Sequence, residues 1–524
     1  DARTLLFNGT SVVLGTQTVG LTAAGVTPLL NSPPVLANAI ADQTVAEDTA
    51  WSYQLPANAF SDPDEDSLSF TASLADGSVL PSWLSFNAST RTFSGTPPMN
   101  FNRNIDLKVT ASDGALRASD TFRLSVVSTE PPAFTDELQI NTFFEGTELA
   151  VVMTALPSGG WLAAYGSQNA VYGQLISSTG QKVGVETALS FNATTDQAIN
   201  GQSPALLTLA NGNVVVSWTA NDGNGSGVFY QLINEGLNFI GMPQRANFST
   251  QGEQSTVWNH PRNTMAQLPN GEWVMVWQSR EQDGSGDGVF MRKFTENGTP
   301  IGDDVQVNAA VTGEQISPAV TALPDGRIAV VWTTEPSPGT GREVLGRIFD
   351  SSLAPITGDF LVNTTTADEQ QAPAITTLAN GNWVVAWMGR TSPVDWDVYV
   401  QIFDSAGNKV GSEFIANDYR FSDQHSITLD GLSDGRWVIT WSSAGQDGSD
   451  FGIFNRVFSA SGAPLTDDIA VNTYTLGRQI QPSVAVNKDD NWFIAWHSDE
   501  QDGFSSGVFG RTFVYSEIES LNFA

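Results

Sequence analysis

The stretch Asn380-Gly381-Asn382-Trp383-Val384-Val385-Ala386-Trp387 decides the fold, because close copies of it recur along most of the chain. An Asn-Gly pair between apolar runs predicts a β-hairpin, and a type I′ turn is the expected form. Trp383 and Trp387 are four residues apart and therefore share one face of the predicted strand. The turns of the seven copies are Ser158-Gly159-Gly160, Asn211-Gly212, Asn270-Gly271, Asp325-Gly326, Asn380-Gly381, Asp434-Gly435 and the degenerate Asp489-Asp490-Asn491.

Each copy ends its second strand on an aromatic residue, and these aromatics recur about every 55 residues: Tyr165, Trp218, Trp277, Trp332, Trp387, Trp441 and Trp496. A third strand follows, such as 288–294, and then a fourth, such as 360–364. Four strands per unit, repeated seven times, predict a seven-bladed β-propeller over residues 137–524. The tryptophans are expected in its core, between the sheets.

The ends of the repeat region predict that the ring is closed by strand exchange. Residues 138–142 match the fourth strand of the other units but precede the first unit, whereas the last unit has only a poor fourth strand at 517–524. We expect the segment 137–142 to complete the last blade, which would remove two exposed sheet edges.

The region before the repeats has a different pattern. Residues 31–130 contain short alternating strands with regular turns, which predict a β-sandwich, and 131–136 form a linker. Residues 1–30 are expected to be the tail of a preceding domain or strands that pair with the rest. The predicted fold class is therefore all-β, a β-sandwich followed by a seven-bladed β-propeller.

Composition excludes several classes of function. The net charge of −33, from 56 acidic and 23 basic residues, disfavours binding to nucleic acid or anionic membranes and favours cations, above all calcium. The absence of cysteine excludes disulfides and thiolate metal sites, and no apolar run is long enough to cross a bilayer. The start at Asp1 indicates a processed product or a fragment. We expect a secreted or cell-surface protein.

The sharpest candidate site is the acidic turn 62–66. Asp62, Asp64 and Asp66 can converge in a loop, and calcium takes six to eight oxygen ligands. Asp113 from a neighbouring turn is a further candidate ligand, together with Asn31 and Glu47. The alternative is a solvated acidic turn without a metal.

Residues 31–128 resemble the cadherin-like domains of the dystroglycan type found in bacterial surface proteins. The motifs that carry the resemblance are 31–34 (Asn-Ser-Pro-Pro), 60–64, 80–86, 90–97 and 109–114. The resemblance implies an immunoglobulin-like sandwich with calcium at the domain junction. Asp62, Asp64 and Asp113 fall on its acidic positions, but Glu65 stands where relatives often have glycine.

The repeats resemble the roughly 55-residue repeats of very large secreted calcium-dependent (RTX-type) proteins of Gram-negative bacteria, which often also carry cadherin-like domains. Four repeats share an Asp-Gly loop between their second and third strands, at Asp222, Asp283, Asp447 and Asp502. A recurring Gln precedes the first strand, at Gln254, Gln315, Gln370, Gln424 and Gln479. We expect both sets on one polar face. This face is either a calcium or glycan surface or only turn chemistry.

The third strand carries Arg or Gln at one register: Gln174, Gln231, Arg292, Arg347, Gln401, Arg456 and Arg511. A residue repeated in every blade is expected to pack the blades together rather than to catalyse a reaction. Three functions stay open: a non-enzymatic calcium-stabilised module for adhesion, matrix or filament assembly; a carbohydrate-active propeller enzyme; and a self-assembling subunit that donates residues 1–30 as strands. The expected partners are calcium and either glycans or other copies of the chain.

Overall fold

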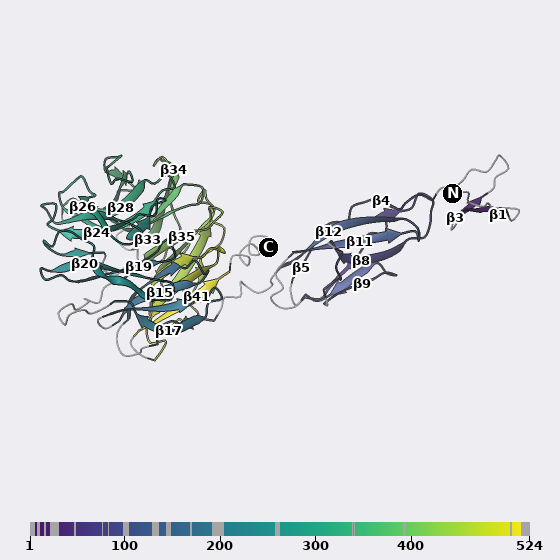
Figure 1. Cartoon of the computed structure of the whole chain (residues 1–524), viewed down its shortest axis with the longest axis horizontal. Helices are drawn as coiled ribbons and strands as arrows, with labels where there is room; N and C mark the ends of the chain where they lie inside the picture. Colours follow the sequence, from purple (N-terminus) through teal and green to yellow (C-terminus); the bar gives the residue numbers. More distant parts are fainter. Residues whose placement is uncertain are drawn as a thin grey trace. The chain divides into compact units, whose positions relative to one another are not determined.

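The computed structural model describes residues 6–7, 11–14, 17–20, 31–46, 49–75, 77–81, 83–97, 104–127, 136–142, 148–167, 170–190, 204–256, 263–337, 339, 341–390, 395–503 and 506–514. Every regular secondary-structure element within these ranges is a β-strand, so the described part of the chain is all-β, as predicted. The chain forms two compact units, one up to Ala133 and one from Phe134 to Tyr515 (Figure 1). No helix of the described residues is long and apolar enough to cross a membrane.

The first unit contains two sheets that share one core. The larger sheet has the order β5 (Gln43–Ala46), β12 (Arg117–Val127), β11 (Asn104–Ser112) and β8 (Ser69–Leu74). The smaller consists of β6 (Trp51–Gln54), β10 (Thr92–Gly95) and β9 (Leu84–Asn87), and a short pair joins β4 (Val35–Leu36) to β7 (Phe60–Ser61). Phe93, Leu107 and Leu124 are fully buried between the sheets. This is the predicted sandwich.

The segment before the sandwich forms a sheet of its own. β1 (Leu6–Phe7), β2 (Ser11–Leu14) and β3 (Gln17–Gly20) pair with one another. The use of residues 1–30 as strands donated to another copy stays a prediction.

The second unit consists of seven sheets in chain order. Their strands are β14 (Glu148–Ala155), β15 (Trp161–Ser167), β16 (Ala170–Ile176) and β17 (Lys182–Ala188); β18 (Ala205–Thr208), β19 (Val214–Asn221), β20 (Ser226–Ile233) and β21 (Phe239–Arg245); β22 (Gln254–Ser255), β23 (Met265–Gln267), β24 (Trp273–Arg280), β25 (Asp287–Phe294) and β26 (Pro300–Gln306); β27 (Glu314–Ala322), β28 (Ile328–Glu335), β29 (Glu343–Phe349) and β30 (Phe360–Leu361); β31 (Gln370–Thr377), β32 (Trp383–Gly389), β33 (Asp397–Phe403) and β34 (Lys409–Ile415); β35 (Gln424–Gly431), β36 (Trp437–Ala444), β37 (Phe451–Phe458) and β38 (Ile469–Ala470); and β39 (Gln479–Val486), β40 (Trp492–Ser498), β41 (Gly507–Phe513) and β13 (Leu138–Gln139).

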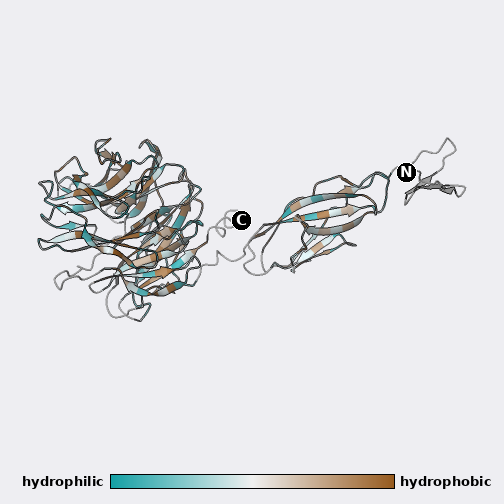
Figure 2. Cartoon of the chain, viewed as in Figure 1, coloured by the Kyte–Doolittle hydropathy of each residue, from teal (hydrophilic) through white to brown (hydrophobic). Residues whose placement is uncertain are grey.

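The first strands of successive sheets contact one another around a cycle. β14 contacts β18, and the contacts continue through β23, β27, β31, β35 and β39. β39 in turn contacts β14, so the last sheet packs on the first. Apolar side chains fill the spaces between neighbouring sheets, and the brown colour of many strand positions in Figure 2 marks these hydrophobic residues.

The repeated tryptophans lie in these spaces. Trp273, Trp277, Trp383, Trp387 and their counterparts are fully buried, which confirms the prediction that they form the core. The first tryptophan of each pair stacks on an aromatic residue of the third strand, its direct neighbour in the antiparallel pairing. The ring centroids of Trp383 and Phe403 are 4.1 Å apart, for example. Such stacking adds about 0.5–1.5 kcal/mol beyond the area that is buried.

The hairpin turns differ from the predicted type. The N–H of Gly212 donates to the carbonyl of Leu209, and the N–H of Leu209 donates to the carbonyl of Asn213. Only Gly212 has a positive φ, at 85°, whereas a type I′ turn needs two such residues. The turn is therefore a type I turn followed by a left-handed residue. In the degenerate copy Asp490 takes this position with φ 58°.

The segment 137–142 supplies the outer strand of the last sheet. Residues 138–139 (β13) pair with 509–510 of β41, and the N–H of Ile140 donates to the carbonyl of Val508 at 2.7 Å. Glu137 accepts hydrogen bonds from the N–H groups of Thr473 and Tyr474. In four other sheets a carboxylate binds the equivalent pair of N–H groups in the preceding sheet: Asp304, Asp359, Glu413 and Asp468. The predicted fourth strand at 517–524 lies outside the described residues.

Candidate functional site

The acidic loops of the sandwich meet the segment that precedes it. The Nδ2 of Asn31 donates to Asp113 Oδ2 at 2.9 Å, and the N–H of Ser32 donates to Asp64 Oδ2 at 2.5 Å. The N–H groups of Leu116 and Ala115 also donate to Asp113 and lower the pKa of its carboxyl. The structure thus brings together Asn31, Asp64 and Asp113, three of the residues that the sequence predicted.

Asp62 organises the acidic turn itself. Its Oδ1 accepts hydrogen bonds from the N–H groups of Asp64 at 2.9 Å and Asp66 at 3.4 Å. Its Oδ2 is buried and has no hydrogen-bond partner within the described ranges. Glu65 has φ 62°, so it takes the left-handed conformation that a glycine at this position would adopt easily.

The predicted ligand set is not assembled around one point. No group of three or more His, Asp or Glu side chains among the described residues is arranged as a metal site. Glu47, another predicted ligand, lies outside the described residues.

The Asp-Gly loops of the second unit have a different chemistry. Asp283 and Asp447 accept a hydrogen bond from the N–H two residues later, at 3.1 and 3.0 Å. Their other oxygens accept from the buried side-chain amides of Asn308 at 3.0 Å and Asn472 at 3.2 Å. Both carboxylates therefore stabilise the repeat, which supports turn chemistry over a ligand surface.

The other two Asp-Gly loops show the same tendency. The Asp222 side chain is 1% exposed and lies 3.5 Å from the guanidinium of Arg245. Asp502 Oδ2 accepts from Gln139 at 3.5 Å. Asp222 Oδ2 is buried without a hydrogen-bond partner among the described residues, but unlike Asp62 it has the charge of Arg245 beside it.

In two of the three sheets that lack the Asp-Gly loop, another carboxylate takes its place. Glu343 and Asp397 stand at the start of the third strand and accept from the amides of Asn363 and Asn417. In the sheets with the loop this position is glycine. A Cβ at Gly288 would lie 2.5 Å from Asp283 Oδ2, and one at Gly452 would lie 2.6 Å from Asp447 Oδ2. The repeat therefore has two ways to provide one carboxylate for its buried asparagine.

The recurring glutamines do not contribute to an exposed face, contrary to the sequence expectation. Gln254, Gln315, Gln370, Gln424 and Gln479 are all buried. Gln254 and Gln315 accept from the side-chain amides of Asn247 and Asn308, both at 3.0 Å. A buried amide costs free energy unless it is hydrogen-bonded, so these contacts explain the repetition.

The arginines of the third strand join neighbouring sheets, as predicted. Each Nη1 donates to a carbonyl of the preceding sheet, over 2.7–3.0 Å: Arg292 to Ala246, Arg347 to Val307, Arg456 to Ala416 and Arg511 to Val471. The glutamines at this register instead bind carbonyls of their own sheet, as Gln231 binds Leu232 and Ile240. The row is structural.

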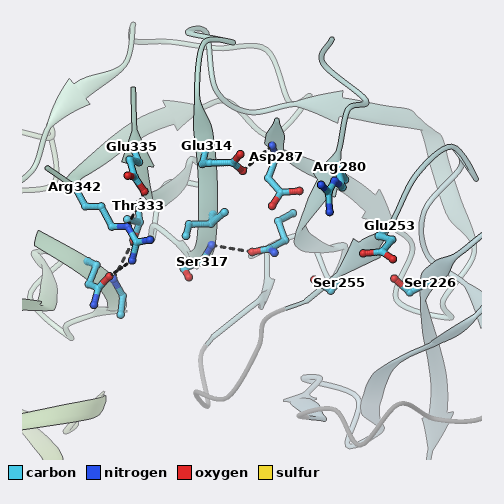
Figure 3. Close-up of a pocket in the computed structure, with 14 residues that line it drawn as sticks. Ser226, Glu253, Ser255, Arg280, Asp287, Glu314, Ser317, Thr333, Glu335 and Arg342 are labelled. Carbon is cyan, nitrogen blue, oxygen red and sulfur yellow. Dashed lines mark hydrogen bonds and ion pairs between the residues drawn. The ribbon is translucent and has the colours of Figure 1, made fainter. Parts of the chain in front are cut away.

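The second unit contains a polar pocket of about 580 Å³ that no sequence motif predicts (Figure 3). Residues of β24 and β25 line it together with β27 and β28 of the next sheet. Its acidic groups are Glu253, Asp287, Glu314 and Glu335, and its basic groups are Arg280 and Arg342. Asp287 and Glu314 are 27 positions apart in sequence and belong to different sheets, so only the packing of the sheets reveals their proximity.

Comparisons with known proteins support an immunoglobulin-like first unit. The family model "Putative Ig domain" matches residues 33–127. No curated protein matches the chain. Among solved structures, the chain is similar to a protein of unknown function from Dyadobacter fermentans DSM 18053, with 12% identity and a TM-score of 0.45, covering 70% of this chain and 98% of that one.

Two carbohydrate-active proteins show similarities of the same order. An α-L-arabinofuranosidase from Fusarium graminearum has 13% identity and a TM-score of 0.41, covering 60% of this chain and 93% of that one. The polysaccharide lyase Uly1 has 10% identity and a TM-score of 0.41, covering 70% and 90%. Similarities at this level assign neither an activity nor a substrate.

Proposed function

We propose that this chain is a non-enzymatic, calcium-stabilised module of a secreted or cell-surface protein, with a cadherin-like sandwich and a closed seven-bladed β-propeller. The observation that carries the calcium part is the sandwich loop, where Asp62 Oδ2 is buried beside Asp64 and Asp66 and has no hydrogen-bond partner among the described residues. A buried carboxylate oxygen without a donor costs free energy, and a bound cation would offset that cost.

The residues of this loop fit calcium chemically. Asp62, Asp64 and Asp113 would supply carboxylate oxygens, with Asp66, the Asn31 side-chain oxygen and Glu47 as further ligands. Calcium accepts such mixed oxygen ligands at about 2.3–2.6 Å. Asn31 and Ser32 now donate to Asp113 and Asp64, so those carboxylates would exchange these donors for the ion.

The cycle of sheet contacts supports the closed propeller. A small central cavity is lined by residues of β14, β18, β31, β35 and β39 together with Asn263, whose amide donates to the carbonyl of Ile375 at 3.1 Å. Strands from most of the seven sheets thus face one axis. The outer strand formed by 137–142 then closes the ring, and the propeller would serve in adhesion, matrix or filament assembly with glycans or other copies as partners.

A carbohydrate-active enzyme is the second candidate. The polar pocket holds an acidic pair, Asp287 and Glu314, that the other sheet junctions do not repeat. The backbone N–H of Asp287 donates to Glu314 Oε2 at 3.0 Å, however, which fixes the Glu314 carboxylate against the Asp287 backbone, whereas glycoside hydrolysis uses two free carboxyl groups about 5–10 Å apart. This geometry favours the non-enzymatic function. Release of reducing or unsaturated sugars from a panel of polysaccharides, abolished by Asp287→Asn, would reverse that choice.

Calorimetric titration of calcium into EDTA-treated, dialysed full-length protein tests the proposed function. We expect saturable binding that Asp62→Asn and Asp113→Asn each weaken by about tenfold or more, because each removes a charged ligand. Asp106→Asn is the matched control, since Asp106 pairs with Arg123 on a strand of the same unit. Absence of binding, or equal binding by Asp62→Asn, would refute the calcium site.

A further inference from the structure

The polar pocket has two chemically different halves (Figure 3). In one half, Arg342 donates to Glu335 at 3.1 Å and to Gln371 Oε1 at 2.5 Å, so its charges are neutralised internally. The other half holds the carboxylates of Glu253, Asp287 and Glu314. Arg280 is its only cation, and no ion pair within 4.0 Å joins Arg280 to a carboxylate of the described residues.

Groups with free hydrogen-bonding capacity line this acidic half. Ser255 is 6% exposed, yet no hydrogen bond joins its hydroxyl to another residue in the described part of the chain. The side-chain oxygen Oε1 of Gln278 accepts a hydrogen bond from the N–H of Ser317 at 3.1 Å, and this bond holds the Gln278 carboxamide at the wall of the pocket. A nearly buried hydroxyl without a protein partner indicates a place for a ligand atom.

The acidic pair is held in place by the backbone. Glu314 Oε2 accepts from the N–H of Asp287 at 3.0 Å. Gly286 makes room for this contact, because a Cβ there would lie 2.7 Å from the carbonyl oxygen of Gly313 and 3.0 Å from Glu314 Oε1. The Glu314 carboxylate is therefore positioned before any ligand binds.

The repeat itself does not require this pair. The buried asparagine of this sheet, Asn308, already has its carboxylate from Asp283. The residues at the position of Asp287 in the other sheets with an Asp-Gly loop are Ser226, Phe451 and Ser506. Two acids are thus placed close together, against their electrostatic repulsion, at one junction between sheets among the described residues. This indicates that the pair has a role other than stabilising the fold.

We propose that the acidic half of this pocket binds the primary ammonium group of a small organic cation. Three carboxylates and a hydroxyl would surround an ammonium group, which has three donors and no acceptor. An anion is disfavoured by the carboxylates. A divalent metal ion is the competing ligand, and calcium chloride tests it below. A neutral sugar is disfavoured because no aromatic side chain is among the lining residues.

The protonation state of the pair links this binding to pH. Burial, and then the neighbouring Glu314, raise the pKa of Asp287 to about 6, while Arg280 lowers it and Glu253 raises it further. As the pH rises through the pKa of about 6, Asp287 loses its proton and its carboxylate attracts the cation. Below pH 6 a proton on Asp287 competes with the ammonium group, so affinity falls.

Calorimetric titration of 1,4-diaminobutane into the full-length protein at pH 7.5 tests this proposal, with glucose and calcium chloride as competing probes. We expect saturable diamine binding that Glu314→Gln and Asp287→Asn each weaken by about tenfold, and that falls again at pH 5. Glu369→Gln is the matched control, because Glu369 precedes Gln370 as Glu314 precedes Gln315 but does not line the pocket. Glucosamine and Nα-acetyl-lysine methylamide then distinguish a free amino compound from a lysine side chain as the source of the ammonium group.

Three results would overturn the proposal: no diamine binding, equal binding by Glu314→Gln, or stronger binding of glucose or calcium at the same residues. Circular dichroism of Glu314→Gln separates loss of the site from loss of the fold. Calcium binding that depends on Asp62 can succeed or fail independently of all these outcomes, because Asp62 lies in the other unit.

Discussion

The two units of this protein use acidic loops that look alike in sequence but have different partners. In the second unit, Asp283 and Asp447 bind buried asparagine amides of their own repeat. In the sandwich, Asp62 keeps one buried oxygen without a partner within the described residues. An Asp-rich loop therefore indicates a cation site only where the fold does not already supply donors to the carboxylate.

The repeated unit shows how such internal donors are arranged. A buried asparagine joins a carboxylate, a glutamine and two backbone groups. Asn472, for example, contacts Asp447, Gln479, the N–H of Ile453 and the carbonyl of Tyr474. If these aspartates stabilise the fold rather than bind a ligand, removing their contacts should lower the free energy of unfolding.

Removal of the buried asparagine should be the most damaging change. Asn472→Ala leaves several buried polar groups without partners, and we expect it to lower the free energy of unfolding by about 3–4 kcal/mol. Urea denaturation of the second unit's transition measures this. Asn297→Ala, at an exposed turn residue, is the control and should change stability by less than about 0.5 kcal/mol. Equal effects of the two substitutions would contradict the account.

The two arrangements of the carboxylate should be interchangeable. Asp447→Ala removes the partner of Asn472, and Gly452→Asp introduces a side chain that collides with Asp447. We expect each to cost about 2 kcal/mol, whereas the double variant, which copies the arrangement of Asp397 and Asn417, should cost no more than either alone. Denaturation of all three variants gives the coupling energy. Simple additivity would show that the carboxylates do not substitute for one another.

We expect the stability of the second unit to depend on pH because of Asp430. It accepts hydrogen bonds from the N–H groups of Val486 and Gly431, and burial raises its pKa to about 6. The folded state therefore holds this proton more tightly, so the stabilisation is present in acid and is lost as pH rises through 6. Relative to Asp430→Asn, the wild-type chain should lose roughly 1–2 kcal/mol between pH 5 and pH 7.5. Parallel pH profiles of the two proteins would contradict this prediction.

The smallest loss of stability is expected for a substitution of Glu137, in the segment that completes the last sheet. Glu137 accepts from Thr473 Oγ1 at 2.7 Å and from Tyr474 N–H at 3.2 Å. Glu137→Ala should lower the stability of the second unit by about 1 kcal/mol, because it leaves these donors to water. Asp136→Ala, at the exposed neighbour, serves as the control in the same denaturation series. If both variants behave alike, residue 137 does not hold the last sheet.

Sequence alone predicts the repeat, the buried tryptophans and the sandwich, because these follow from local periodicity. It misassigned the turns, since an Asn-Gly pair suits both a type I′ turn and a type I turn with a left-handed glycine. It placed the recurring glutamines on a surface because it did not identify their partner asparagines, which lie in the loops after β21 and β26. A sequence signal for them exists: Asn247 and Gln254, like Asn308 and Gln315, are seven residues apart.

The acidic pocket was beyond this reasoning for a different reason. Asp287 and Glu314 have no shared motif, and only the contact between two sheets brings them together. The acidic turn of the sandwich was found because its residues are adjacent in sequence. Glu47, which completes the predicted ligand set, lies outside the described residues.

Differential scanning calorimetry of the full-length protein, in millimolar calcium and then in excess EDTA, tests the contrast between the two units most directly. A ligand at 100 times its dissociation constant stabilises the unit that binds it by about 2.7 kcal/mol. We predict that EDTA lowers only the sandwich transition, that Asp62→Asn abolishes this response and that Asp283→Asn preserves it. A calcium response of the seven-sheet transition, or of neither transition, would contradict the account.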